Sequence, residues 1–178
     1  MNLETFLQKE IKQFPNINFV RFTQDYLPFY LRWFKDPLVL RHLNKSTPQN
    51  DIQISRFVNF ASTSVTDHYY IINLDNEPIG HTGLKNIDYQ LFSAELSCVI
   101  GEKKYIGQGV GLSTMVHFIK YVLTNYPKIK TFEFTRLTGL PNNIYKSLCF
   151  KKSGNKEGSD IYTVNKIQLL ELLNKIEK

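Results

Sequence analysis

The stretch Gly107-Gln-Gly-Val-Gly111 is the part of this chain best suited to bind an anion. It follows an apolar run, residues 96–100, that is typical of a strand, and it opens a segment from Leu112 to Leu123 with apolar residues at helical spacing. Glycine lets the backbone bend and approach a ligand closely, and the first N–H groups of a helix are free to donate. The pattern predicts a phosphate-bearing cofactor or, as the alternative, a tight glycine turn without a ligand.

Helices and strands are predicted on both sides of this loop. Helices are expected at residues 3–11, 24–34, 52–61, 112–123, 142–148 and 167–176, and strands at 17–22, 68–74, 79–87, 91–100, 130–136, 150–153 and 161–164. This order predicts an α+β fold, a central twisted mixed sheet of about six to seven strands with helices on both faces. We expect one domain over residues 1–178, with 1–14 as an extra N-terminal helix and 166–178 as a C-terminal helix.

The composition argues against a membrane protein and against a nucleic-acid-binding protein. Of the 178 residues 42% are hydrophobic and 21% charged, and no apolar run is long enough for a membrane span. The net charge of +6 favours anionic ligands, but the basic residues are scattered, so nucleic-acid binding is not expected. Cys98 and Cys149 lack metal-ligand spacing and are expected to be reduced thiols in a cytoplasmic protein.

Three motifs together resemble the GNAT superfamily of N-acetyltransferases. Residues 99–111 resemble its acetyl-coenzyme A loop, and Arg32-Trp33 with Asp36-Pro37 is similar to the first-helix signature of the branch that acetylates ribosomal-protein N-termini and small amines. Residues 142–150, with Tyr145, look like the family's late helix. The resemblance runs from about Phe19 to Val164 and implies direct acetyl transfer from acetyl-CoA without a metal.

The chain also departs from the family pattern at four positions. Ile106 stands where glutamine or arginine is frequent, and Cys149 replaces the usual glycine before phenylalanine. Thr138 and Pro141 stand where the family often has asparagine and serine. These departures concern side-chain contacts to the pantetheine arm more than contacts made by the backbone.

The resemblance implies a donor site built mostly from main-chain groups. Its members are Val99, Ile100, Ile106, Gly107, Gln108, Gly109, Val110, Gly111, Leu112, Ser113 and Thr138, with Thr114 as an alternative to Ser113. A backbone N–H near Val99 or Ile100 is expected to face the thioester oxygen, because the family's strand bulges there.

Two residues are predicted to carry the chemistry. Glu95 lies in an otherwise apolar strand and is the expected base, acting through water on an acceptor ammonium that must lose a proton. Its alternative role is an ion pair with a lysine or arginine. Tyr145 is the expected acid that protonates the leaving thiolate, and its alternative role is a structural tyrosine.

The acceptor site is less defined. Tyr30, Trp33, His81 and Asp88 are the substrate-binding candidates, although core packing for the rings and a turn hydrogen bond for Asp88 are the alternatives. Glu133 is a further candidate for the cleft. The expected acceptor is a small amine or amino sugar, with a peptide N-terminus as the alternative. A homodimer is possible, and a non-catalytic acyl-CoA-binding module is the competing class.

Overall fold

A computed structural model of the chain describes residues 3–41, 43, 47–137 and 146–177. In chain order its elements are α1 (Leu3–Gln13), β1 (Ile17–Arg21), the 3₁₀ helix η1 (Gln24–Tyr26), α2 (Leu27–Trp33), α3 (Pro37–Leu40), α4 (Asp51–Thr63), β2 (His68–Leu74), β3 (Glu77–Asp88), β4 (Ser93–Ile100), the 3₁₀ helix η2 (Lys103–Tyr105), α5 (Val110–Asn125), β5 (Thr131–Leu137), β6 (Lys151–Lys156), β7 (Ser159–Asn165) and α7 (Lys166–Ile176). The predicted helix 142–148 falls mostly outside the described residues, and so do Thr138, Pro141 and Tyr145.

The strands form one seven-stranded sheet in the order β1-β2-β3-β4-β5-β7-β6. Neighbouring strands are antiparallel except β4 and β5, which are parallel and joined through α5. A parallel pair needs such a crossover. Short turns join β2 to β3, β3 to β4 and β6 to β7, whereas η1, α2, α3 and α4 lie in the connection between β1 and β2. The predicted mixed sheet is therefore confirmed.

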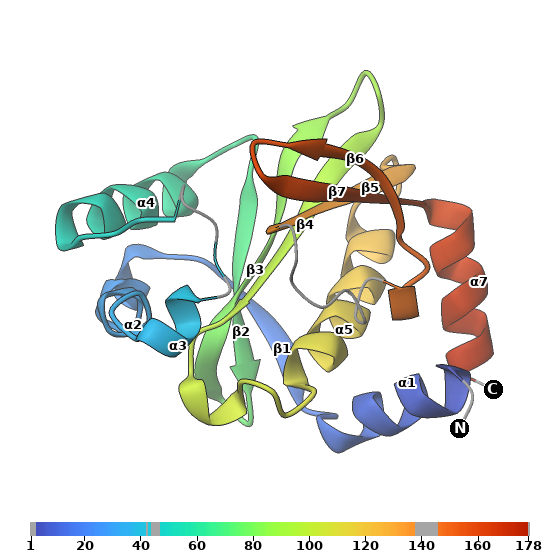
Figure 1. The fold of residues 1–178 in the computed structure, drawn as a ribbon, viewed down its shortest axis with the longest axis horizontal. Coiled ribbons are helices and arrows are strands. Elements are labelled where there is room, and N and C mark those ends of the chain that lie inside the picture. Colours follow the sequence, from blue (N-terminus) through green and yellow to red (C-terminus); the bar gives the residue numbers. More distant parts are fainter. Residues whose placement is uncertain (1–2, 42, 44–46, 138–145, 178) are drawn as a thin grey trace.

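Helices cover both faces of the sheet (Figure 1): α2, α3 and α4 lie on one side, and α1, α5 and α7 on the other. Strand alternation explains this division. In β5, Phe132 and Phe134 point into the core under α5 and α7, so Glu133 lies on the opposite face. A second core packs α2 and α4 against β2, with Tyr30 and Trp33 buried in it.

Short-range capping sets several helix starts. The Asn50 side chain accepts from the Gln53 N–H at the start of α4, and Asp36 caps α3 with Pro37 in its first turn. Asn165 and Gln168 form a capping box at α7.

None of the helices in the part of the chain that the structure describes is long and apolar enough to cross a membrane. Within the same residues no group of three or more His, Cys, Asp or Glu side chains is placed to hold a metal ion.

Candidate active site

The glycine loop turns the chain from η2 into α5 with two residues in the left-handed region. Gly107 has φ +79° and Gly109, the residue before α5, has φ +87°. Residues other than glycine rarely adopt this backbone conformation. A Cβ on Gly107 would meet no atom within 4 Å, so that position requires glycine for its backbone angle alone.

The loop's main-chain amides divide into two groups. The amides of Tyr105, Ile106, Gln108 and Leu112 already donate to protein carbonyls at 3.0 to 3.3 Å. By contrast, the amides of Gly107, Gly109, Val110 and Gly111 make no hydrogen bond to any described residue. The expected donor contacts from the backbone of Ile106, Gln108 and Leu112 are therefore corrected, because the η2 turn and the first turn of α5 use those amides. The four free amides at the positive end of α5 remain available to an anion.

Strands β4 and β5 separate next to this loop. They pair only from Ser93↔Thr131 to Leu96↔Phe134, although β4 continues to Ile100 and β5 to Leu137. The last four residues of β4 thus have no described strand beside them on the β5 side. The gap beside these residues adjoins the glycine loop, because Ile100 Cγ1 lies 3.8 Å from the point where a Cβ on Gly111 would be.

The orientation of the β4 amides follows from its pairing with β3. Gly101 N–H donates to Ile79 O at 2.8 Å, and the register is regular from Gly80↔Ile100 to Lys85↔Glu95. Because antiparallel residues alternate in direction, the Ile100 amide faces the gap and the Val99 amide faces β3. The bulge expected near Val99 is not in this register, whose irregularity lies between Lys85 and Asp88.

Trp33 fixes the chain where β4 ends. Its ring lies where a Cβ on Gly101 would be, and its Nε1–H donates to the Glu102 carboxylate at 2.8 Å. Arg32 contacts the same carboxylate. The Arg32-Trp33 motif therefore anchors the residues between β4 and the donor loop.

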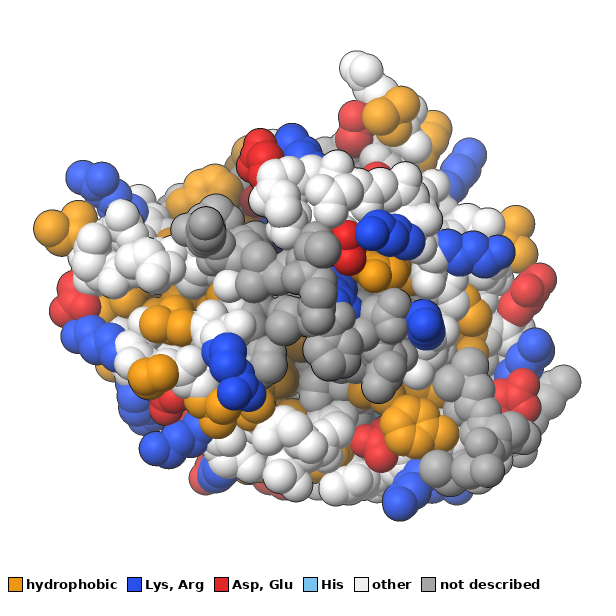
Figure 2. All heavy atoms as spheres, viewed as in Figure 1, with side chains coloured by type: hydrophobic (Ala, Val, Ile, Leu, Met, Phe, Trp, Pro, Cys, Tyr) orange, Lys and Arg blue, Asp and Glu red, His pale blue; other side chains and the backbone are white. Residues whose placement is uncertain are grey.

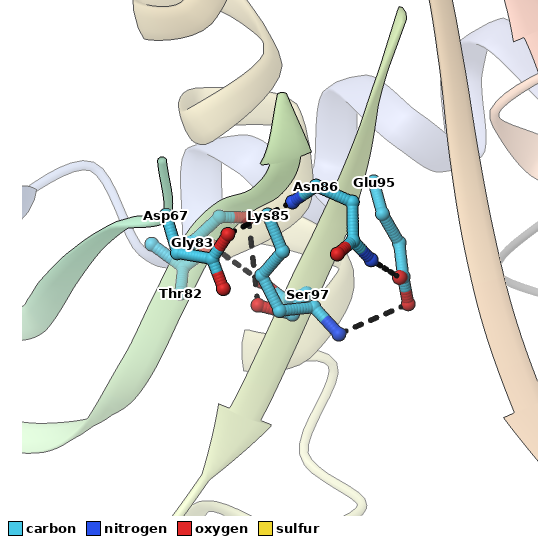
Figure 3. Close-up of polar contacts among 7 residues, drawn as sticks. All are labelled: Asp67, Thr82, Gly83, Lys85, Asn86, Glu95 and Ser97. Carbon is cyan, nitrogen blue, oxygen red and sulfur yellow. Dashed lines mark hydrogen bonds and ion pairs between the residues drawn. The ribbon is translucent and has the colours of Figure 1, made fainter. Parts of the chain in front are cut away.

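Glu95 is held by two donors at the last paired rows of β4 (Figure 3). Lys85 Nζ lies 3.0 Å from Oε1, and Asn86 Nδ2 lies 2.9 Å from Oε2. The Asn86 N–H in turn donates to Asp67 Oδ1 at 3.0 Å. The alternative that paired Glu95 with a lysine is thus what the structure shows, although β4 is a central strand.

Glu133 lies beside Glu95 across the parallel pair. The two residues share a row of the β4–β5 register and point to the same face of the sheet. Unlike the Glu95 carboxylate, the Glu133 carboxylate forms no ion pair or hydrogen bond with a described residue. This face therefore presents one neutralised and one uncompensated carboxylate at the point where the strands separate.

The aromatic substrate-binding candidates are in the core. Tyr30 and Trp33 are 0% and 1% exposed, and His81 is 5% exposed with its ring stacked on Tyr30 at 5.3 Å between centroids. Burial lowers the pKa of His81 to about 3, so the ring is neutral at physiological pH. Because these side chains offer almost no surface, the structure corrects their assignment to the acceptor site and favours the core alternative.

Asp88 and Ser113 are also used differently from the prediction. Asp88 Oδ1 accepts from the amides of Gln90 and Leu91 at 2.7 and 2.8 Å, which is the turn role given as its alternative. Ser113 and Thr114 are fully buried in the first turns of α5, and their hydroxyl oxygens have no hydrogen-bond partner among the described residues. Sequence reasoning missed Lys85 and Asn86, whose only signal is their place opposite Glu95 in a hairpin.

A family comparison fits this geometry. An acetyltransferase (GNAT) domain model matches residues 16–143, most of the chain. The chain therefore belongs to the GNAT acetyltransferase family. A search of curated proteins gives no match.

Solved structures share the fold at low sequence identity. Spermidine N-acetyltransferase from Vibrio cholerae, in complex with CoA and spermine, has a TM-score of 0.74 at 14% identity and covers 88% of this chain and 99% of its own. The aminoglycoside acetyltransferase AAC(6')-Ib, in complex with coenzyme A, has a TM-score of 0.74 at 11% identity, covering 87% and 98%. A domain from Methanocaldococcus jannaschii has a TM-score of 0.67 at 21% identity, covering 84% and 97%.

Proposed function

We propose that this protein is an acetyl-CoA-dependent N-acetyltransferase that transfers the acetyl group directly to a primary amine of a small molecule or amino sugar. The observation that carries the proposal is the set of four free amides, at Gly107, Gly109, Val110 and Gly111, at the N-terminus of a 16-residue helix. Such an end stabilises a diphosphate through hydrogen bonds and through the helix dipole. Family membership supports the same donor.

In the proposed reaction the donor lies between β4 and β5 with its thioester oxygen near the Ile100 amide. The deprotonated amine attacks the thioester carbon, the C–N bond forms and the C–S bond breaks. The Ile100 N–H would stabilise the charge that develops on oxygen. Tyr145, which lies outside the described residues, remains the proposed acid for the leaving thiolate.

Two carboxylates compete for the role of base. Glu95 is the residue predicted from the sequence, but both of its oxygens already accept hydrogen bonds from Lys85 and Asn86. Glu133 lies in the same row of the sheet without such partners. Glu133→Gln and Glu95→Gln enzymes separate them, because only loss of the base should lower kcat strongly while leaving the affinity for CoA unchanged.

The acceptor is proposed from the charge of the sheet face. Because Lys85 and Glu95 neutralise each other, Glu133 leaves this face with a net negative charge, which attracts an acceptor ammonium. Figure 2 shows Lys and Arg side chains spread over the viewed face with acidic side chains between them, which gives no continuous band for a nucleic acid. We therefore favour a small amine or amino sugar as the acceptor of a cytoplasmic enzyme, with a peptide N-terminus as the second choice.

Two measurements test the proposal. Thermal unfolding should show stabilisation by CoA, of about 2.7 kcal/mol when CoA is at one hundred times its dissociation constant. A thiol-release screen with acetyl-CoA and a panel of amines should then give amine-dependent turnover. Binding without turnover on any amine would favour a non-catalytic acyl-CoA-binding module, and no CoA binding would exclude both functions.

A further inference from the structure

The donor loop has a neighbour from the far end of the chain. Helix α1 crosses beneath α5 and packs against it and against α7, and its last turn reaches the loop before α5 (Figure 1). Leu7 of α1 is completely buried, and Gln8 Nε2 donates to Ile176 O at 2.9 Å. The position of α1 on the molecule is therefore fixed by packing on both of its neighbours.

One charged side chain of α1 points at the loop. The Glu10 carboxyl carbon lies 3.0 Å from the point where a Cβ on Gly109 would be, and one carboxylate oxygen lies closer still. Gly109 is the residue before α5 and carries one of the four free amides. Glu10 thus holds a carboxylate directly against the proposed phosphate site.

The Glu10 carboxylate interacts favourably with the N-terminus of α5 when no ligand is bound. The start of α5 has no acidic residue of its own in the first turn and no side-chain cap. A negative charge near a helix N-terminus is stabilising. Glu10 forms no hydrogen bond or ion pair with a described residue, and its carboxylate lies against Gly109. A bound diphosphate would place further negative charge beside this carboxylate.

We infer that Glu10 is part of the donor site and opposes the donor's phosphates there, so that it lowers the affinity for the donor. The inference rests on the proposed function, because it assumes that coenzyme A binds at this loop. Since Leu7 and Gln8 hold the helix, the Glu10 side chain must turn away or tolerate the repulsion when the donor binds. A residue outside the family match then sets the strength of donor binding.

The inference predicts two effects of opposite sign for Glu10→Gln, which removes the charge and keeps the shape. Without ligand, the variant should unfold about 1–4 °C lower, because α5 loses a favourable charge at its N-terminus. Its affinity for CoA should rise about fivefold or more, the size of an ordinary coupling between two sites. A residue that only packed α1 would lower stability without raising affinity.

Isothermal titration of CoA and of inorganic pyrophosphate into the full chain measures the second effect. The matched control is Glu4→Gln, which makes the same charge change in the first turn of α1. Tighter binding of both probes by Glu10→Gln alone supports the inference. Equal CoA affinity in wild type and Glu10→Gln overturns it and leaves the proposed function intact. No CoA binding by any of the three folded proteins overturns the proposed function and the inference with it.

Discussion

At the scale of single residues, the Lys85–Glu95 pair decides how the polar face of the sheet is charged. Both side chains are mostly covered, with 26% and 16% of their surfaces exposed, so each needs the other to compensate its charge. Asn86 holds the second carboxylate oxygen and is itself bound through Asp67. Glu95 is therefore a well-oriented group whether or not it is the base.

A double-mutant cycle tests this pairing. Lys85→Met and Glu95→Gln should each destabilise the protein, and the double variant should lose less than the sum, with a coupling of about 0.5–3 kcal/mol. Urea unfolding of the four proteins measures it. The Lys120–Glu177 pair, which is more exposed on the other side of the sheet, should give a coupling under about 1 kcal/mol. Additive effects at Lys85 and Glu95 would contradict the ion pair.

Cys149 explains why the family often has glycine at its position. Its φ is +63°, in the left-handed region that a β-branched residue strongly disfavours. Cys149→Val should therefore lower the free energy of unfolding by about 1–3 kcal/mol, whereas Cys149→Gly should fold normally with little loss. Thermal unfolding compares the two. A valine variant as stable as the wild type would contradict a left-handed backbone at Cys149.

Sequence reasoning found Glu95 but not its partners, for a physical reason. Which residues of β3 face Glu95 depends on the hairpin register, and one irregularity between Lys85 and Asp88 sets it. A slip of one residue would move every side chain to the other face. The burial of Trp33 and His81 depends likewise on how α2 packs against the sheet, which involves residues distant in sequence.

At the scale of elements, the turn from η2 into α5 was the most predictable part of the site. Its glycines, the strand before it and the helix after it are all encoded within the consecutive residues 93–125, so local signals suffice. The caps at Asn50 and Asp36 were predictable on the same ground. The separation of β4 from β5 was not, since it depends on strands that are distant in sequence.

A matched pair of glycine substitutions tests the role of the loop. Gly107 and Gly158 have φ +79° and +76°, and a Cβ on either would meet no atom within 4 Å. Alanine at either position should cost about 1–2 kcal/mol of stability from backbone strain alone. Only Gly107→Ala should also weaken CoA binding, measured by titration, because it shifts the free amides. Equal CoA affinity in both variants would argue against the loop as the phosphate site.

At the scale of the whole molecule, the sheet and its two helical layers were predicted correctly, because hydrophobic alternation and helical periodicity are averaged over many residues. The docking of α1 beside the donor loop was not predictable, since an amphipathic helix does not specify which apolar surface covers it. That contact comes from the packing of Leu7, Phe6 and Ile11 against the assembled core and from the Gln8–Ile176 hydrogen bond.

The acid stability of the protein should depend on His81. In the unfolded chain this residue takes up a proton below its ordinary pKa of 6.5, but in the folded protein only near pH 3. The unfolded state binds more protons between these values, so stability falls as the pH falls through this window, by up to about 1.4 kcal/mol per unit. His81→Phe should lose less stability than the wild type between pH 6.5 and 4.5, measured by urea unfolding. Parallel losses would place the titrating group elsewhere.

The pairing between β4 and β5 is the shortest in the sheet. On one side β1 to β4 form a meander, and on the other side β5, β7 and β6 form a smaller antiparallel unit, with four register pairs between them. Local opening should begin at such a narrow junction, where few main-chain bonds must break. A donor lying in the gap would join both units, so its binding should slow amide hydrogen exchange in β5 as well as in β4. The donor would then bridge β4 and β5 beyond Leu96↔Phe134, the last of the four register pairs that join these two strands.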